Sequence, residues 1–184
     1  PVEVTYALHS QNIVDANENI TNFEEALKLE DTRKVGRNLP PNVDPPRTIY
    51  YKETANFFPR IKKLKENIPN KDIFIGLQND LKNDTIYFIK AVERFLGIKH
   101  FDKYKLDRIN ENKTVKHVKI NQLIKNPGSF KTKLFRSFLP SKRLRKWAVE
   151  KVYESNLKHT RRKNLSEKTK LELKQYFKKN NELL

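Results

Sequence analysis

Apolar residues recur at intervals of three or four positions along most of the chain, and this spacing predicts amphipathic helices. The longest such stretch covers residues 48–68, where Pro59 predicts a kink or break. Residues 84–97 form a second strong pattern, which Asp84 caps and Gly97 ends. Weaker patterns of the same spacing predict further helices over residues 2–14, 21–29, 121–125, 141–157 and 166–179.

Capping and turn residues predict several boundaries. Thr21 and Glu24 have the spacing of a capping box, which predicts that Thr21 caps the helix that follows. Ser166 is expected to cap the last helix. Residues 30–47 contain four prolines and one glycine, and they are predicted to form a long proline-rich loop. Long ordered loops in compact domains often serve a binding site.

One short apolar run has the character of a strand. Ile73–Leu77 is bounded by polar residues on both sides, and its unbroken apolar character predicts burial on both faces, as in a parallel sheet. A length of 184 residues is typical of a single domain. We therefore predict one α/β domain over residues 1–184 that is predominantly helical and has few strands.

The chain is strongly basic. Lys and Arg number 39 against 22 Asp and Glu, which gives a formal net charge of +17 and a pI of about 9.9. Such a charge attracts polyanions, and salt weakens the attraction. Three interpretations stay open at this point: a nucleic-acid partner, a phosphorylated cofactor with an anionic acceptor, or a general lysine bias, since lysines lie in nearly every segment.

Composition excludes several kinds of chemistry. The absence of Cys excludes disulfides, thiolate metal sites and cysteine nucleophiles. The sequence shows no signal peptide and no apolar run near the ~20 residues of a membrane helix, so we predict a cytoplasmic protein. It also has no glycine-rich phosphate loop. The four histidines lack the spacing of metal ligands, and no metal site is predicted.

Residues 108–116 combine cations with short amides. The cations Arg108, Lys113 and Lys116 alternate with Asn110 and Asn112 in a polar segment. Guanidinium, ammonium and carboxamide groups all donate hydrogen bonds to anionic oxygens. The segment is therefore a candidate phosphate site, while a solvated asparagine-rich loop is the other interpretation that these residues allow.

Several motifs follow the order of one enzyme family. Pro1–Tyr6 resembles the continuation of the family's Arg-Asn-Pro motif, and Phe23–Leu27 resembles its Phe-Glu-Glu-Ala helix. Phe95–Ile98 is similar to its Phe-Leu-Gly segment, Asn110–Lys113 to the loop that closes over its nucleotide, and residues 165–183 to its terminal helix. By this order the chain resembles sulfotransferases that use 3′-phosphoadenosine 5′-phosphosulfate (PAPS). The resemblance covers most of residues 1–125 and 165–184.

The resemblance implies a P-loop-like α/β fold, in which helices flank a parallel sheet. It also implies an enzyme that moves a sulfuryl group from its cofactor PAPS to a hydroxyl or amine of a small-molecule, lipid or carbohydrate acceptor. In the family, the first strand, the phosphosulfate loop and the usual catalytic base come before the position of Pro1. The chain is therefore expected to be a downstream portion that is inactive alone, and no catalytic residue is assigned.

The resemblance also implies site residues. A family serine that grips the 3′-phosphate corresponds to Ala7, and Ser10, three residues on, is expected to substitute for it. The loop Arg33–Arg47 is expected to shape the acceptor pocket. Its expected acceptor contacts are Arg33, Lys34 and Arg37, and the expected nucleotide contacts are Ser10, Arg108, Asn110, Asn112, Lys113 and Lys116.

The alternative is a basic nucleic-acid-binding domain, or another non-catalytic domain that binds polyanions. It depends on the charge of +17 and on the basic run Lys142–Lys146. The chain carries no helix-turn-helix, zinc-finger or aromatic-sheet signature, so no specific nucleic acid is expected. Steeply salt-dependent binding to plain DNA without nucleotide binding would favour this alternative.

Overall fold

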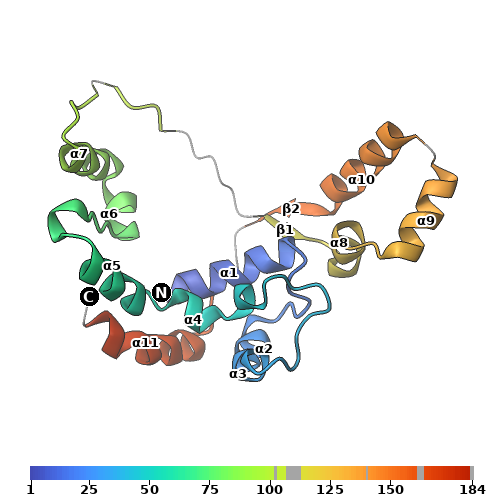
Figure 1. Cartoon of the computed structure of the whole chain (residues 1–184), viewed down its shortest axis with the longest axis horizontal. Coiled ribbons are helices and arrows are strands. Elements are labelled where there is room, and N and C mark those ends of the chain that lie inside the picture. Colours follow the sequence, from blue (N-terminus) through green and yellow to red (C-terminus); the bar gives the residue numbers. More distant parts are fainter. Residues whose placement is uncertain (102, 107–112, 140, 161–163, 183–184) are drawn as a thin grey trace. The chain divides into compact units, whose positions relative to one another are not determined.

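The chain divides into two compact units (Figure 1). The computed structural model describes all residues except 102, 107–112, 140, 161–163 and 183–184. The larger unit consists of Pro1–Phe57 with Glu111–Leu183, and the smaller one is Phe58–Asn110. The single domain over residues 1–184 that the sequence predicts stays a prediction.

The first part of the larger unit consists of short helices joined by irregular segments. The long predicted loop 30–47 is helical at both ends and irregular between them. The elements are α1 (Val2–Val14), α2 (Phe23–Lys28), α3 (Glu30–Lys34), the 3-10 helix η1 (Pro46–Ile49) and α4 (Tyr51–Ala55).

The predicted capping box is wrong by one residue. Asn22, not Thr21, caps α2, because the side-chain oxygen of Asn22 accepts a hydrogen bond from the Glu25 amide at 3.1 Å. Glu24 does not bond back to Thr21. Instead its Oε1 accepts hydrogen bonds from the hydroxyls of Ser166 and Thr169, each at 3.2 Å, and so ties α2 to the start of the last helix.

The second part of the larger unit begins with a strand and ends with the last helix. Its helices over 142–156 and 167–181 confirm two of the predicted helices, and Ser166 caps the last one as predicted. The helix over residues 118–125 is longer than the single turn predicted over residues 121–125. The elements are β1 (Lys113–Val115), α8 (Val118–Lys125), α9 (Ser129–Phe138), α10 (Lys142–Asn156), β2 (Leu157–His159) and α11 (Glu167–Asn181).

The predicted P-loop-like α/β fold is wrong for this chain. The described residues are mostly helical, and their only sheet is the antiparallel pair β1–β2, with Lys113 opposite His159 and Val115 opposite Leu157. The described part contains no parallel sheet. The predicted strand Ile73–Leu77 is extended at both ends but has no ladder partner among the described residues.

The smaller unit is helical, and both predicted ends of its longest helix are confirmed. It contains α5 (Phe58–Asn67), η2 (Asn70–Asp72), α6 (Gln78–Asn83) and α7 (Thr85–Leu96). Asp84 caps α7 by accepting from the Tyr87 amide at 2.9 Å, and Gly97 ends it in the left-handed conformation with φ 68°. The predicted break in 48–68 is confirmed, because α4 ends before α5 begins, and Pro59 lies in the first turn of α5.

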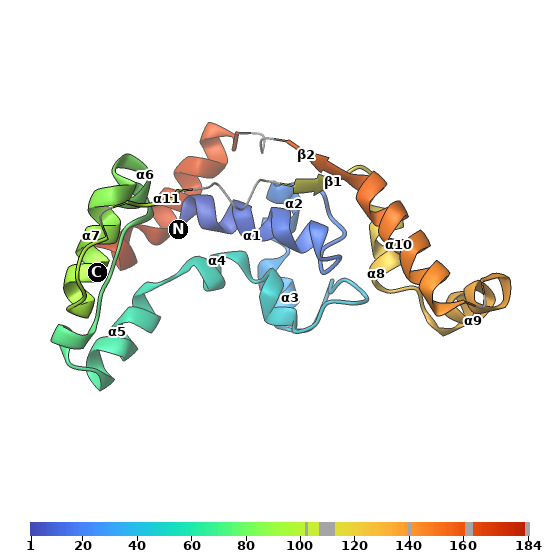
Figure 2. The same cartoon turned by 90° about the horizontal axis from the view of Figure 1, so that it is seen from above.

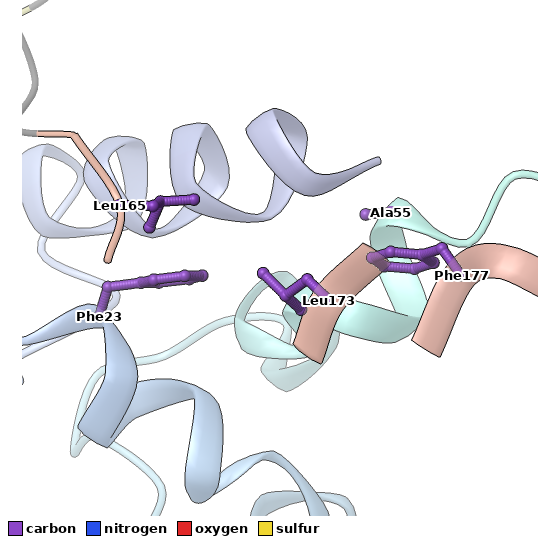
Figure 3. Close-up of a cluster of buried hydrophobic side chains, with 5 residues drawn as sticks. All are labelled: Phe23, Ala55, Leu165, Leu173 and Phe177. Atoms are coloured by element: carbon purple, nitrogen blue, oxygen red, sulfur yellow. The ribbon is translucent and has the colours of Figure 1, made fainter. Parts of the chain in front are cut away.

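Three small clusters form the core of the larger unit. Figure 3 shows the first, in which Leu173 and Phe177 of α11 pack with Phe23, Leu165 and Ala55. The second joins Ile13, Val14 and Val115, and the third joins Ala26, Ile49 and Tyr51. The first two clusters join the N-terminal helices to the C-terminal part, and the third lies within the N-terminal helices alone. In the described part of the chain, no helix has the length and apolarity needed to cross a bilayer.

Candidate functional site

A fully buried ion pair lies at the centre of the N-terminal helices. The Nη1 of Arg33 lies 2.7 Å from Oε2 of Glu18, and its Nη2 lies 3.0 Å from Oε1. The hydroxyl of Tyr51 donates to the same carboxylate at 2.7 Å, and the backbone amides of Asn19 and Ile20 complete its hydrogen bonds. All three side chains in this network are buried. Two parallel N–H···O bonds and three further donors compensate the burial of the charges.

Proton affinities in this network follow from burial and charge. Burial raises the pKa of Glu18, but hydrogen bonds from Arg33, the Ile20 amide and Tyr51 outweigh it and hold that pKa below its ordinary value. Burial and the adjacent Glu18 carboxylate raise the pKa of the Tyr51 phenol. The network is therefore charged at neutral pH, with an ionised carboxylate, a guanidinium and a neutral phenol.

His9 belongs to the same buried region. Its Nε2 lies 2.8 Å from the carbonyl oxygen of Ile20, and because a carbonyl only accepts, this nitrogen carries the hydrogen. The rings of Phe23 and Tyr51 pack beside it. Burial lowers the pKa of His9, and the Ile20 carbonyl and Glu18 only partly oppose this effect. The imidazole is therefore neutral, buried and hydrogen-bonded to the Ile20 carbonyl, which fits a structural role better than that of a general base.

We expect His9 to make the protein less stable in mild acid. Its pKa in the folded state lies below the ordinary 6.5, so stability is greatest above about pH 6.5 and falls as the pH drops toward the folded pKa. The slope is at most about 1.4 kcal/mol per pH unit. Urea unfolding at a series of pH values measures it. His9→Gln should flatten the loss, whereas the exposed His117→Gln should leave it unchanged. Equal slopes in all three proteins would contradict this assignment.

The three predicted acceptor contacts have different surroundings. Arg33 is buried in the ion pair with Glu18, so it exposes no surface to an acceptor. Lys34 lies 3.2 Å from Glu30 and 3.6 Å from Glu53. Arg37 is exposed. Acceptor contact by Lys34 and Arg37 stays a prediction, while Arg33 organises the interior of this segment.

The ion pair of Lys34 with Glu30 follows from the buried position of the Glu30 carboxylate. This carboxylate accepts from the backbone amides of Lys52 at 2.7 Å and Glu53 at 3.1 Å, and so satisfies the first amides of α4. Burial lowers the pKa of Lys34, but the charge and hydrogen bond of Glu30 and the charge of Glu53 outweigh it, and that pKa is raised. Lys34 thus balances a helix-capping carboxylate.

The strand after the predicted phosphate loop packs directly on α1. Val115 forms a buried cluster with Ile13 and Val14, and Leu157 of β2 packs against it. The buried side chain of Asn121 donates to the carbonyl oxygens of Ile13 at 2.9 Å and Val14 at 3.0 Å. These carbonyls belong to the last turn of α1, where the Ile13 carbonyl also accepts from the Ala16 amide at 3.3 Å. The β1–β2 ribbon and the start of α8 are therefore fixed to the end of α1.

Alternation along the ribbon sets which side chains face α1. Successive side chains of a strand point to opposite faces, so Lys113 and His159 share the face of Val115 and Leu157. Thr114 and Lys158, the remaining pair, lie on the other face. We name three residues together the ribbon site. Lys113 and His159 lie on the α1-facing side of the ribbon, and Ser10 lies on α1.

Ser10 lies on the stripe of α1 that leads to the ribbon. Ala7, Ser10 and Val14 have helical spacing of three and four residues and so share one side of α1. The hydroxyl of Ser10 donates to the Tyr6 carbonyl at 2.9 Å, which leaves its oxygen able to accept. Lys113 is exposed. Ser10 therefore lies one turn before the α1 residue that contacts β1, and Lys113 lies two residues before Val115 on β1.

The other predicted nucleotide contacts lie elsewhere. Lys116 donates from Nζ to the Ser155 carbonyl at 2.6 Å, and its amide donates to the Asn156 carbonyl at 2.8 Å, so it closes the base of the ribbon. Arg108, Asn110 and Asn112 lie outside the described residues. Sequence reasoning missed His159, because a strand of three residues is too short for its alternation to be recognised.

No protein-family model, curated protein or solved structure matches the chain.

Proposed function

We propose that the chain binds the 3′-phosphate end of PAPS and takes part in the transfer of its sulfuryl group to a hydroxyl or amine. The observation that carries this proposal is the packing of β1 on α1. The resemblance assigns the start of α1 and the loop before Lys113 to the same nucleotide, and two segments that share a ligand must lie close together. Val115 and Asn121, which follow this loop in the sequence, contact Ile13 and Val14 at the end of α1, one turn after Ser10.

The chemistry of the ribbon site suits a phosphate. The Lys113 ammonium supplies hydrogen bonds and positive charge to anionic oxygens, and the His159 imidazole carries an N–H that donates. The Ser10 hydroxyl would donate to a phosphate by turning away from the Tyr6 carbonyl. Glu3 lies one turn before Ala7 on the same stripe of α1 and is the one acid on it, at the end away from the ribbon. In this proposal the cofactor supplies the sulfuryl group, and this chain binds and orients its nucleotide.

Titration of adenosine 3′,5′-bisphosphate into the chain tests the proposal. Backbone NMR resonances of Ser10 and Lys113 are expected to shift more with this nucleotide than with adenosine 5′-monophosphate, which lacks the 3′-phosphate. Lys113→Gln is expected to weaken binding about tenfold, because a hydrogen bond to a charged group contributes about 1.5 kcal/mol. Lys158→Gln is the matched control, since Lys158 belongs to the same ribbon but lies on the opposite face.

Two results would contradict nucleotide binding at the ribbon site. Equal weakening by Lys113→Gln and Lys158→Gln would indicate general attraction of anions to a basic surface. Equal affinity for the two nucleotides would show that the 3′-phosphate is not recognised. Salt-sensitive binding to duplex DNA without any preference between the nucleotides would favour the alternative of a nucleic-acid-binding domain.

A further inference from the structure

Helices α8, α9 and α10 surround an open apolar groove. Figure 2 shows α10 beside α8, with α9 following α8 along the chain. The groove has a volume of about 440 Å³. Leu123 lines it from α8, Leu134 and Phe138 line it from α9, and Val149 and Val152 line it from α10. Helices α9 and α10 lie outside the residues that the resemblance covers, and none of the groove residues belongs to the ribbon site.

The apolar side chains around this groove are unusually exposed. Phe138 is 76% exposed, Leu134 is 51% exposed and Val152 is 47% exposed. Trp147 of α10 does not line the groove and is 59% exposed. Leu144 is also exposed and lies one turn before Ala148, a groove residue, on the same side of α10. Large apolar side chains that gather on a surface mark a site of interaction with another molecule or with a membrane.

Exposed cations lie on the same two helices. Lys133 and Arg136 on α9 and Lys142 and Arg143 on α10 are exposed. The only acids in residues 118–156 are Glu150 and Glu154, and these already pair with Lys146 at 3.8 Å and Lys151 at 3.0 Å. The segment is therefore strongly positive as well as apolar on its surface, and its complement must be both anionic and apolar.

We propose that the surface of α8, α9 and α10 docks on an anionic lipid bilayer. In this arrangement Leu134 and Phe138 enter the boundary between headgroups and acyl chains, and the exposed lysines and arginines of α9 and α10 contact the lipid phosphates. A nucleic acid would satisfy the cations but would leave the apolar side chains exposed. The openness of the groove to solvent favours a surface over an enclosed ligand. This docking is independent of nucleotide binding at the ribbon site.

The single tryptophan makes the proposal directly measurable. Trp147 is the only tryptophan of the chain and lies on α10, so its fluorescence reports on this helix. With vesicles of phosphatidylcholine and phosphatidylglycerol we expect a blue shift of its emission, quenching by brominated acyl chains, and co-sedimentation of the protein. Binding to vesicles of pure phosphatidylcholine is expected to be weaker by a factor of about ten or more. Salt is expected to weaken binding to the anionic vesicles.

Paired variants separate the apolar and cationic contributions. Leu134→Ser with Phe138→Ser is expected to lower vesicle binding about tenfold, whereas Leu171→Ser, at an exposed leucine of α11, should change it little. Lys142→Gln with Arg143→Gln should remove most of the preference for anionic vesicles. Lys168→Gln with Lys174→Gln removes two exposed lysines of α11 and is the charge control. Circular dichroism checks that each variant keeps its helices.

Several outcomes would overturn the proposal. Equal loss in the control variants, or equal binding to neutral and anionic vesicles, would show that this surface does not recognise anionic lipid. A blue shift without lipid that grows with protein concentration would show that a second copy of the chain covers the surface. Protection of Trp147 by duplex DNA but not by vesicles would assign the surface to nucleic acid.

Discussion

Replacing Arg33 with methionine is expected to lower the free energy of unfolding by about 3–5 kcal/mol, because it leaves the Glu18 carboxylate buried without its cation. The guanidinium makes two short hydrogen bonds to that carboxylate, and both side chains are buried. A loss of this size is a large part of the about 5–15 kcal/mol that stabilises a typical domain. Urea unfolding followed by circular dichroism measures it.

Two further variants test whether the stranded charge is the cause. Arg37→Met removes an exposed arginine from the same segment and is expected to change stability by about 0.5 kcal/mol or less. Adding Glu18→Gln to Arg33→Met removes the unpaired charge while keeping an oxygen for the Tyr51 hydroxyl, so part of the lost stability should return. If Arg33→Met and Arg37→Met cost the same, the buried pair does not stabilise the fold as argued.

The same arginine shows where reading the sequence fails. A cation in a proline-rich loop is expected to face an acceptor, yet Arg33 lies in α3 and turns toward Glu18, fifteen residues earlier. Nothing in the spacing of the two residues marks them as partners, because the loop between α1 and α2 brings them together. Burial of a charge depends on such nonlocal partners, and the sequence pattern records only local ones.

Helix-capping residues predicted the structure more successfully. Asp84 and Gly97 act within one helical turn of the residues that they cap, so their positions predicted both ends of α7. The error at α2 has the same origin, because Thr21 and Asn22 are both good capping residues and only the backbone conformation at Asn22 selects one of them. Cap chemistry predicts that a helix begins here, with an uncertainty of one residue.

The strand prediction failed for a different reason. An unbroken apolar run such as Ile73–Leu77 indicates burial, but it does not say against what. In the structure Phe74 packs against the rings of Phe88 and Phe95 of α7, while Leu77 stays 62% exposed. A strand also needs a neighbour that accepts and donates its backbone hydrogen bonds, and no described segment supplies one.

The ribbon site was half predictable. The helical stripe of Ala7, Ser10 and Val14 can be read from the sequence, and so can the cation Lys113. What the sequence does not reveal is that Val115 and Asn121 dock on the end of α1, because that contact joins residues more than a hundred positions apart. The short strand β2, which carries His159 beside Lys113, exists only through its pairing with β1.

The last helix is expected to be the other large contributor to stability. Phe177→Ala should lower the free energy of unfolding by about 3–5 kcal/mol, because it opens a cavity in a cluster that is otherwise filled. Phe177 and Leu173 are both buried, and they join α11 to Phe23 of α2 and Ala55 of α4 (Figure 3). The variant should also lower Tm by about 2–4 °C for each kcal/mol lost.

Tyr176→Ala is the matched control, because it removes the neighbouring aromatic residue from the exposed side of the same helix. Tyr176 is 47% exposed and contributes a ring contact to Phe177 at 5.0 Å and a cation–π contact with Lys52 at 5.4 Å. Its loss is expected to cost about 0.5–1 kcal/mol. Hydrogen exchange of the α11 amides should accelerate strongly in Phe177→Ala and only slightly in Tyr176→Ala. Similar losses of unfolding free energy in the two variants would mean that α11 is not anchored through its buried face. The hydrogen bonds from Ser166 and Thr169 to Glu24 would then have to hold the helix.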